Sequence, residues 1–135
     1  MSIKGFEDVQ ETLNGDEIEI AKFIAMSFNQ SALLQGKDNA KSANKIIDEL
    51  KQNTGKNLSQ IKLRSIINYI RNNNMVYGLC SNSKGYYKAK NVEEFKDHLI
   101  SLRDRIKMQT YTFNNQKRQY ETMLKQTHKE NKELF

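Results

Sequence analysis

The stretch that decides the fold is residues 59–90, SQIKLRSIINYIRNNNMVYGLCSNSKGYYKAK. Its first half predicts a helix, because Ser59 can cap the N-terminus and the apolar residues that follow recur at the spacing of one helical face. Those apolar residues are Leu63, Ile66, Ile67 and Ile70, and the asparagines at 72–74 end the helix. The second half predicts a β-hairpin, since two short β-prone segments, 76–79 and 86–89, flank the turn-forming sequence CSNSKG, with Gly85 as its positive-φ residue.

Two further helices are predicted upstream of this stretch. One covers about 16–29, with Asp16 as its N-cap and an apolar stripe along one face. The other covers about 40–52 and ends at NTGKN, where Gly55 can adopt a positive φ. Residues 1–15 show weak periodicity, so we expect them to form a flexible N-terminal arm.

A long last helix is predicted over 92–135, with Asn91 as its cap. Apolar residues recur along it every seven positions and again three positions later, as at the a and d positions of a coiled coil. They are Val92, Phe95, Leu99, Leu102, Ile106, Phe113 and Tyr120, with Gln109 and Gln116 at the intervening places. A helix of about 35 residues spans roughly 50 Å, more than a small domain covers. We therefore expect part of this seam to pair with a second copy or with the first predicted helix, or to bind a partner protein.

The basic residues are concentrated in one window of the chain. Between Lys51 and Val92 there are eight lysines and arginines and no acid, whereas the whole chain has a formal charge of +6. A surface of one sign concentrates polyanions, and duplex nucleic acid is the commonest of them. A lysine-rich surface without a binding function is the alternative explanation of the same pattern.

The composition argues against several other classes of protein. The chain has one cysteine and no P-loop, dinucleotide-binding or zinc-binding motif, so we expect a non-enzymatic protein without a metal or cofactor. No apolar run approaches 18 residues and the first residues lack the apolar core of a signal peptide. We therefore expect no membrane partner and a cytoplasmic location.

The order helix, turn, helix, basic hairpin is typical of a winged helix-turn-helix. The expected fold is mainly α with a small β-hairpin wing, as a domain over 16–91, followed by the long helix over 92–135. The third helix would present its polar face to the major groove of duplex DNA. On and beside that face lie Lys62, Arg64, Ser65, Asn68, Tyr69, Arg71 and Asn72. The wing would add Ser83 and Lys84 at its tip and Lys88 and Lys90 along its returning strand.

The chain from about Leu33 to Arg105 resembles the small winged-helix proteins of bacteriophages and other mobile elements, often encoded near replication genes. The resemblance lies in LLQGKDNA, KIIDEL, LRSIINYIR and SNSKGYYKA, followed by a helix with EE and LRDR. It covers roughly half the chain and implies a DNA-binding fold acting in replication or transcriptional control in the host cytoplasm. It also implies DNA contact at Ser59, Gln60, Lys62, Arg64 and Asn68, and wing contact at Lys84.

The expected partner is therefore double-stranded DNA, bound at a palindromic site by a homodimer that the last helix would form. One residue departs from the family's pattern: Ile61 stands where such helices commonly carry a basic or polar residue. An exposed isoleucine could touch a thymine methyl group, or it could mark a surface that binds a protein. The alternative function is thus a phage-encoded interaction module, a host-factor inhibitor or replication accessory, with the winged helix as scaffold. An RNA-binding module has less support, since no aromatic-rich strand pattern is present.

Overall fold

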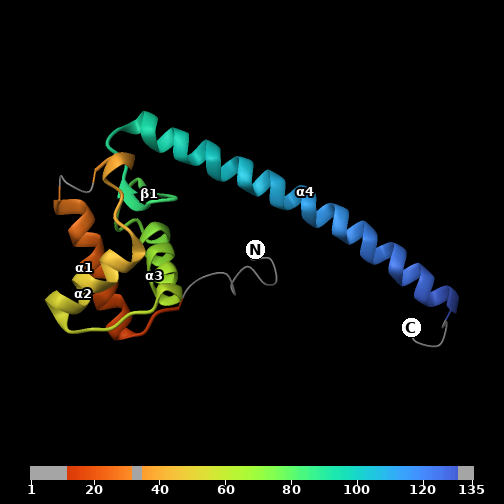
Figure 1. The fold of residues 1–135 in the computed structure, drawn as a ribbon, viewed down its shortest axis with the longest axis horizontal. Coiled ribbons are helices and arrows are strands. Elements are labelled where there is room, and N and C mark those ends of the chain that lie inside the picture. The colour runs from red at the N-terminus through yellow and green to blue at the C-terminus, as the bar shows by residue number, and fades with distance from the viewer. Residues whose placement is uncertain (1–11, 32–34, 131–135) are drawn as a thin grey trace. The chain divides into compact units, whose positions relative to one another are not determined.

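The computed structural model describes residues 12–31 and 35–130, which form a helical protein with one small antiparallel sheet (Figure 1). The elements are α1 (Gly15–Gln30), the 3-10 turn η3 (Lys37–Asn39), α2 (Ala43–Thr54), α3 (Gln60–Asn72), β1 (Leu79–Asn82), β2 (Gly85–Lys88) and α4 (Val92–Glu130). The chain divides into an N-terminal unit that ends at Lys96 and a C-terminal unit that starts at Asp97. The mainly helical class, the hairpin and the long last helix are confirmed.

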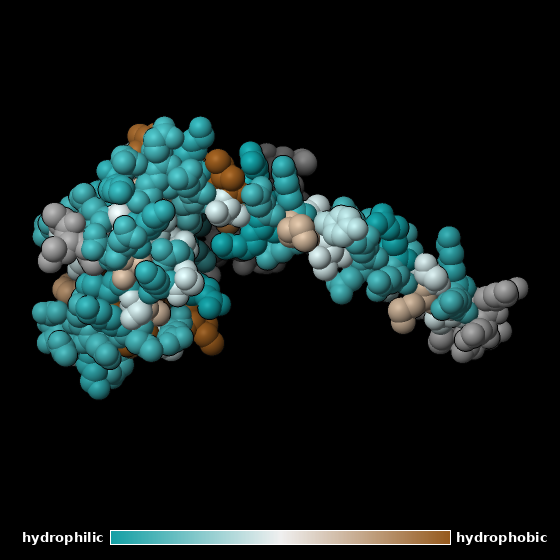
Figure 2. Space-filling model, turned by 45° about the horizontal axis from the view of Figure 1, so that its top comes forward, coloured by the Kyte–Doolittle hydropathy of each residue, from teal (hydrophilic) through white to brown (hydrophobic). Residues whose placement is uncertain are grey.

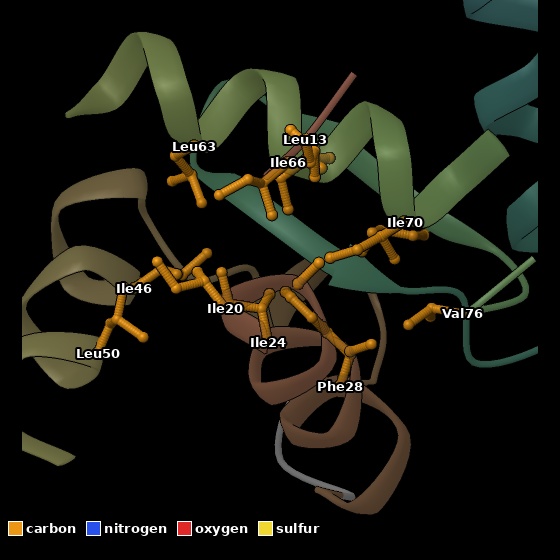
Figure 3. Close-up of a cluster of buried hydrophobic side chains, with 14 residues drawn as sticks. Leu13, Ile20, Ile24, Phe28, Ile46, Leu50, Leu63, Ile66, Ile70 and Val76 are labelled. Atoms are coloured by element: carbon orange, nitrogen blue, oxygen red, sulfur yellow. The ribbon is translucent and has the colours of Figure 1, made fainter. Parts of the chain in front are cut away.

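The core of the N-terminal unit lies between α1, α2 and α3 (Figure 3). Figure 3 shows Leu63, Ile66 and Ile70 of α3 pointing toward α1. The four apolar residues predicted to anchor α3 are at most 1% exposed, which confirms the predicted inner face. The residues that meet them are Ile20, Ile24 and Phe28 of α1, Ile46 and Leu50 of α2, and Val76 after α3.

The first helix begins one residue earlier than predicted. Asn14, and not Asp16, is its N-cap: the Asn14 side chain accepts a hydrogen bond from the Glu17 amide at 2.8 Å, and the Glu17 carboxylate accepts one from the Asn14 amide at 3.0 Å. This reciprocal pair satisfies two amide groups that the helix itself leaves free. Leu13 is buried in the core. The prediction of a flexible arm that reaches residue 15 is therefore wrong for residues 13–15. Residues 1–11 lie outside the described part.

The helices α2 and α3 have clear capping signals at their starts and at the turn between them. The Ser42 hydroxyl accepts a hydrogen bond from the Lys45 amide, so α2 begins at Ala43 and not near residue 40. Gly55 ends α2 with φ 75°, and Ser59 caps α3 through the Lys62 amide, both as predicted. Correct caps at both ends of this turn fix where α3 begins.

The hairpin is shifted relative to its prediction. The first strand is Leu79–Asn82, so the predicted strand over 76–79 is wrong: Gly78 has φ 76°, which interrupts an extended chain, and Val76 is buried in the core instead. The second strand agrees with its prediction to within one residue, and Ser81 pairs with Tyr86 across the hairpin. The two-residue turn between the strands is Ser83–Lys84.

The segment before α2 also pairs with β2, which the sequence did not predict. Lys41 exchanges two backbone hydrogen bonds with Tyr86, at 2.8 and 2.9 Å, and the Gly36 amide donates to the Lys88 carbonyl at 2.8 Å. The hairpin is thereby tied to the start of α2. Gly85, with φ 143°, lies directly against the backbone of Lys41 and Ser42.

The long helix α4 starts inside the N-terminal unit. Asn91 caps it by accepting a hydrogen bond from the Glu94 amide at 2.9 Å, as predicted. Glu94 is buried and accepts a bond from the Lys90 amide. Phe95 is half-buried beside Gly78, so this predicted seam residue belongs to the packing of the N-terminal unit.

We expect Gly85→Ala to destabilise the fold strongly. A Cβ at this position would overlap the Lys41 carbonyl and lie 2.8 Å from the Ser42 Cα, and the positive φ adds backbone strain. The free energy of unfolding should fall by about 2 kcal/mol or more, a drop of roughly 10 °C in Tm by calorimetry. Gly15→Ala is the matched control, because a Cβ there meets nothing within 4 Å and its Tm should not fall. Equal Tm values for the two variants would contradict the tight contact at Gly85.

Candidate nucleic-acid interface

The outer face of α3 carries a row of four polar side chains at four-residue spacing. Gln60, Arg64, Asn68 and Asn72 follow one another along the helix, and residues four apart are neighbours on a helix surface. The row lies away from the buried residues of α3, and only Asn68 in it is half-buried. The predicted contacts Gln60, Arg64 and Asn68 are thus brought together on one exposed surface.

A cleft of about 410 Å³ opens at the first residue of this row. It is lined by the first turn of α2, by Gln60 and by the hairpin tip: Ser42, Ala43, Asn44, Gln60, and residues 81–86. The Gln60 amide donates a hydrogen bond to the Asn44 side chain at 2.6 Å and so joins the starts of the two helices. First-turn amide groups carry partial positive charge, and Lys84 adds a full one. The cleft is therefore polar and electropositive on two sides.

The tip of the hairpin is exposed, and hydrogen bonds within its own turn stabilise it. The Asn82 side-chain oxygen accepts hydrogen bonds from the Lys84 amide at 2.9 Å and the Gly85 amide at 3.2 Å. Ser83 and Lys84 are both exposed, as predicted for a wing tip. On the returning strand, Lys88 donates to the Asn29 side chain of α1 at 3.2 Å, whereas Lys90 is exposed.

Acidic residues from α1 neutralise part of the basic window. Lys62 forms an ion pair of 2.9 Å with Glu17, and Lys56 one of 3.6 Å with Asp16. The hydrogen bond from the Asn14 amide, and then Lys62, lower the pKa of Glu17 below its usual value. A window with no acid in the sequence is thus not free of acids on the surface. Lys62 is half-buried and tied to α1, apart from the row on α3.

Arg71 and Tyr69 do not face solvent in the way that the pattern predicts. The Arg71 Nε donates to the Leu79 carbonyl at 3.0 Å, and its guanidinium lies 5.9 Å from the centre of the Tyr86 ring. Burial lowers the pKa of Arg71, and no described residue accepts a hydrogen bond from its buried Nη2. Tyr69 packs against the core. Arg71 is half-buried and not exposed as predicted, and its hydrogen bond to the Leu79 carbonyl joins α3 to β1.

Two of the three serines predicted as contacts, Ser59 and Ser65, are engaged in local bonds. The Ser59 hydroxyl accepts from the Lys62 amide at 3.1 Å, and the Ser65 hydroxyl donates to the Ile61 carbonyl at 3.5 Å. Among the described residues, the exposed basic side chains of the window that have neither an ion pair nor a side-chain hydrogen bond are Lys51, Arg64, Lys84 and Lys90.

Sequence reasoning missed the contribution of α2 to this surface. Ser42 and Asn44 line the cleft. The prediction started α2 near residue 40, so it did not place these two residues at the start of the helix, where they lie. The signal was present in the sequence, since Ser42 is a strong N-cap residue directly before the apolar stripe of α2. The ion pair of Glu17 with Lys62 could not be predicted from a local sequence pattern, because the two residues are 45 positions apart.

The seam predicted on α4 is exposed along the C-terminal unit. Ile106, Phe113 and Tyr120 are 54–62% exposed, and Leu99 and Leu102 are exposed as well. Val92 is also exposed, at the start of the helix. In Figure 2, scattered brown to tan groups interrupt a largely hydrophilic surface. No described residue covers this seam, and the homodimer stays a prediction.

Within residues 12–31 and 35–130, no group of three or more histidine, cysteine, aspartate or glutamate side chains could hold a metal ion. No helix in that part of the chain is long and apolar enough to cross a membrane.

We expect the buried thiol of Cys80 to make stability fall at alkaline pH. Burial raises the pKa of this thiol to about 11, whereas the unfolded thiol ionises near 9.0. Ionisation therefore favours the unfolded chain above pH 9, and the stability is lost progressively as pH rises to about 11. Between pH 8 and 10.5, urea unfolding should show a loss of about 1–2 kcal/mol beyond that of Cys80→Ala, which lacks the thiol. Parallel pH profiles for the two proteins would contradict this.

Comparison of the chain with protein-family models, with curated proteins and with solved structures finds no match in any of the three.

Proposed function

We propose that the N-terminal unit is a winged helix-turn-helix that binds double-stranded DNA. The observation that carries this proposal is the single surface on which the polar row of α3 meets the hairpin tip at one cleft. The order of elements supports it: helix, a short bridged segment, two helices and a hairpin, with the bridged segment paired to β2. Such an order and pairing are expected of a winged helix, in which the hairpin would be the wing and α3 the recognition helix.

In this proposal α3 enters the major groove with its polar row toward the bases. Asparagine and glutamine can bond adenine through two atoms at once, and arginine can do the same with guanine. Gln60, Asn68 and Asn72 are suited to the first role and Arg64 to the second. Lys84 and Ser83 would reach the adjacent backbone, and a phosphate would lie near the first turn of α2.

The ion pairs on α1 set a limit on how strongly the surface attracts DNA. Of the eight basic residues of the window, two are paired with acids, Lys88 bonds to Asn29 and Arg71 is half-buried. About four phosphates can therefore be neutralised without breaking a contact. Binding would then weaken with salt at a slope of log K against log salt of about −4. The resemblance to phage winged-helix proteins supports a role in replication or transcriptional control.

A second candidate function is favoured by one residue. Ile61 is 79% exposed in the first turn of α3, directly after Gln60. A large apolar side chain at that place suits a protein partner as well as a thymine methyl group. In this alternative the winged helix is a scaffold for protein binding, and duplex DNA would not bind measurably even at low salt.

We expect Arg64→Ala and Lys84→Ala each to weaken DNA binding roughly tenfold, since each removes an exposed cation from the proposed surface. The measurement is fluorescence anisotropy with random duplex DNA across a salt series, where each variant should also lower the salt slope by about one. Lys22→Ala is the control, because Lys22 lies on α1, pairs with Glu19 and does not line the cleft. An equal loss in all three variants would indicate attraction by net charge alone.

We also expect Glu17→Gln to tighten DNA binding, by about threefold at low salt. The change frees Lys62 from its ion pair, while glutamine can still accept the capping hydrogen bond from Asn14. Glu19→Gln is the matched control: it makes the same charge change on the same helix but frees only Lys22. If the two variants bind DNA equally, the surface around Lys62 takes no part in binding.

A further inference from the structure

The exposed seam of α4 has flanks of one charge sign. We define the α4 seam as Leu99, Leu102, Ile106, Phe113, Tyr120 and Met123, all exposed in the C-terminal unit. In heptad terms these are a and d positions, and the e and g positions beside them decide which helices can pair. Over 98–124 the e positions are Arg103, Thr110, Lys117 and Leu124, and the g positions are His98, Arg105, Thr112 and Gln119. Three of these eight are basic and none is acidic.

The three acids of the same helix between residues 97 and 124 lie elsewhere on its surface. Asp97 and Asp104 fall at f positions and Glu121 at a b position, which face away from the seam. Arg103 does contact an acid, Asp104, at 3.8 Å, but both side chains are more than half exposed and such a pair is weak. The charge of Arg103 is therefore hardly reduced by this pair, and the flanks of the seam stay basic.

This charge pattern disfavours a second copy of the chain as the partner. In an antiparallel pair e positions face e positions and g face g, and in a parallel pair g faces e. Either arrangement sets arginine and lysine against basic or neutral residues and provides no attractive pair. Gln109 and Gln116 at the centre of the seam weaken self-association further.

We propose that the α4 seam binds an amphipathic helix of another protein, one whose apolar face is flanked by glutamate or aspartate. Acidic residues at the partner's e and g positions would meet Arg103, Arg105 and Lys117, while its apolar side chains cover the exposed aromatic and aliphatic groups. The seam from Leu99 to Met123 is about 36 Å long, so a partner helix of about 25 residues covers it. This inference is independent of DNA binding by the N-terminal unit.

The test uses the full chain and a designed probe. The probe is a labelled 28-residue peptide with leucine at a and d and glutamate at e and g, and its counterpart carries lysine at e and g. Fluorescence anisotropy should show binding of the glutamate peptide at least about tenfold tighter than that of the lysine peptide, with the difference shrinking as salt rises. Equal affinity for the two peptides, or no binding of the glutamate peptide, would overturn the proposal.

Two triple variants locate the contact. Arg103→Glu, Arg105→Glu and Lys117→Glu together should weaken binding of the glutamate peptide at least about tenfold and strengthen binding of the lysine peptide. The matched control is Lys107→Glu, Arg118→Glu and Lys125→Glu, which makes the same charge change at b and f positions and should leave both affinities within about twofold. Circular dichroism checks that α4 stays helical in both variants.

The competing occupants give distinct results. If the chain alone sediments as a dimer at tens of micromolar and Ile106→Glu makes it monomeric, a second copy covers the seam and the proposal is wrong. If duplex DNA displaces the glutamate peptide from the wild-type chain, the basic flanks bind nucleic acid and the proposal is wrong as well. Unchanged peptide affinity in the presence of DNA supports a dedicated protein-binding seam.

Discussion

The burial of one face of α3 against α1 is the interaction on which the N-terminal unit depends. Leu63, Ile66, Ile67 and Ile70 are at most 1% exposed, and their side chains fix the rotation of α3 about its own axis (Figure 3). Because a helix repeats every 3.6 residues, that rotation also decides which residues remain outside. The polar row from Gln60 to Asn72 is exposed for this reason, and no feature of the row itself is needed to hold it there. The exposed polar surface of α3 is thus a by-product of core packing.

The tertiary fold changes the meaning of the charge pattern. Along the sequence the window after Lys51 has a single sign. Folding, however, brings Asp16 and Glu17 to Lys56 and Lys62, and it leaves Arg71 half-buried against the Leu79 carbonyl of β1. What remains exposed and uncompensated includes Arg64 on α3 and Lys84 on the hairpin. Charge counted along a chain therefore overestimates the field at a surface, and the overestimate is largest where an acidic helix start packs beside a basic segment.

The parts of the structure that follow from local rules could be predicted from the sequence, and the parts that need distant contacts could not. The inner face of α3, its Ser59 cap and the positive φ of Gly55 depend on residues within a few positions, and all three predictions are confirmed. The first strand was misplaced because Val76 and Leu79 look alike in a β-prone run, and only core packing decides that Val76 is buried before the strand begins. The pairing of Lys41 with Tyr86 and the cover over Arg71 join residues far apart in sequence, for which periodicity carries no information.

The contact between Gly85 and the backbone before α2 has a consequence for how this surface can vary. The width of the cleft is set by main-chain hydrogen bonds between Lys41 and Tyr86 and by the absence of a side chain at Gly85. The side chains of Ser83 and Lys84 take no part in these contacts, since hydrogen bonds to the Asn82 side chain hold their turn. Residues 83 and 84 can therefore change in size or charge while the frame around them keeps its dimensions. The hairpin tip is thus the part of the cleft whose size and charge can vary independently of the contacts that hold the hairpin to α2.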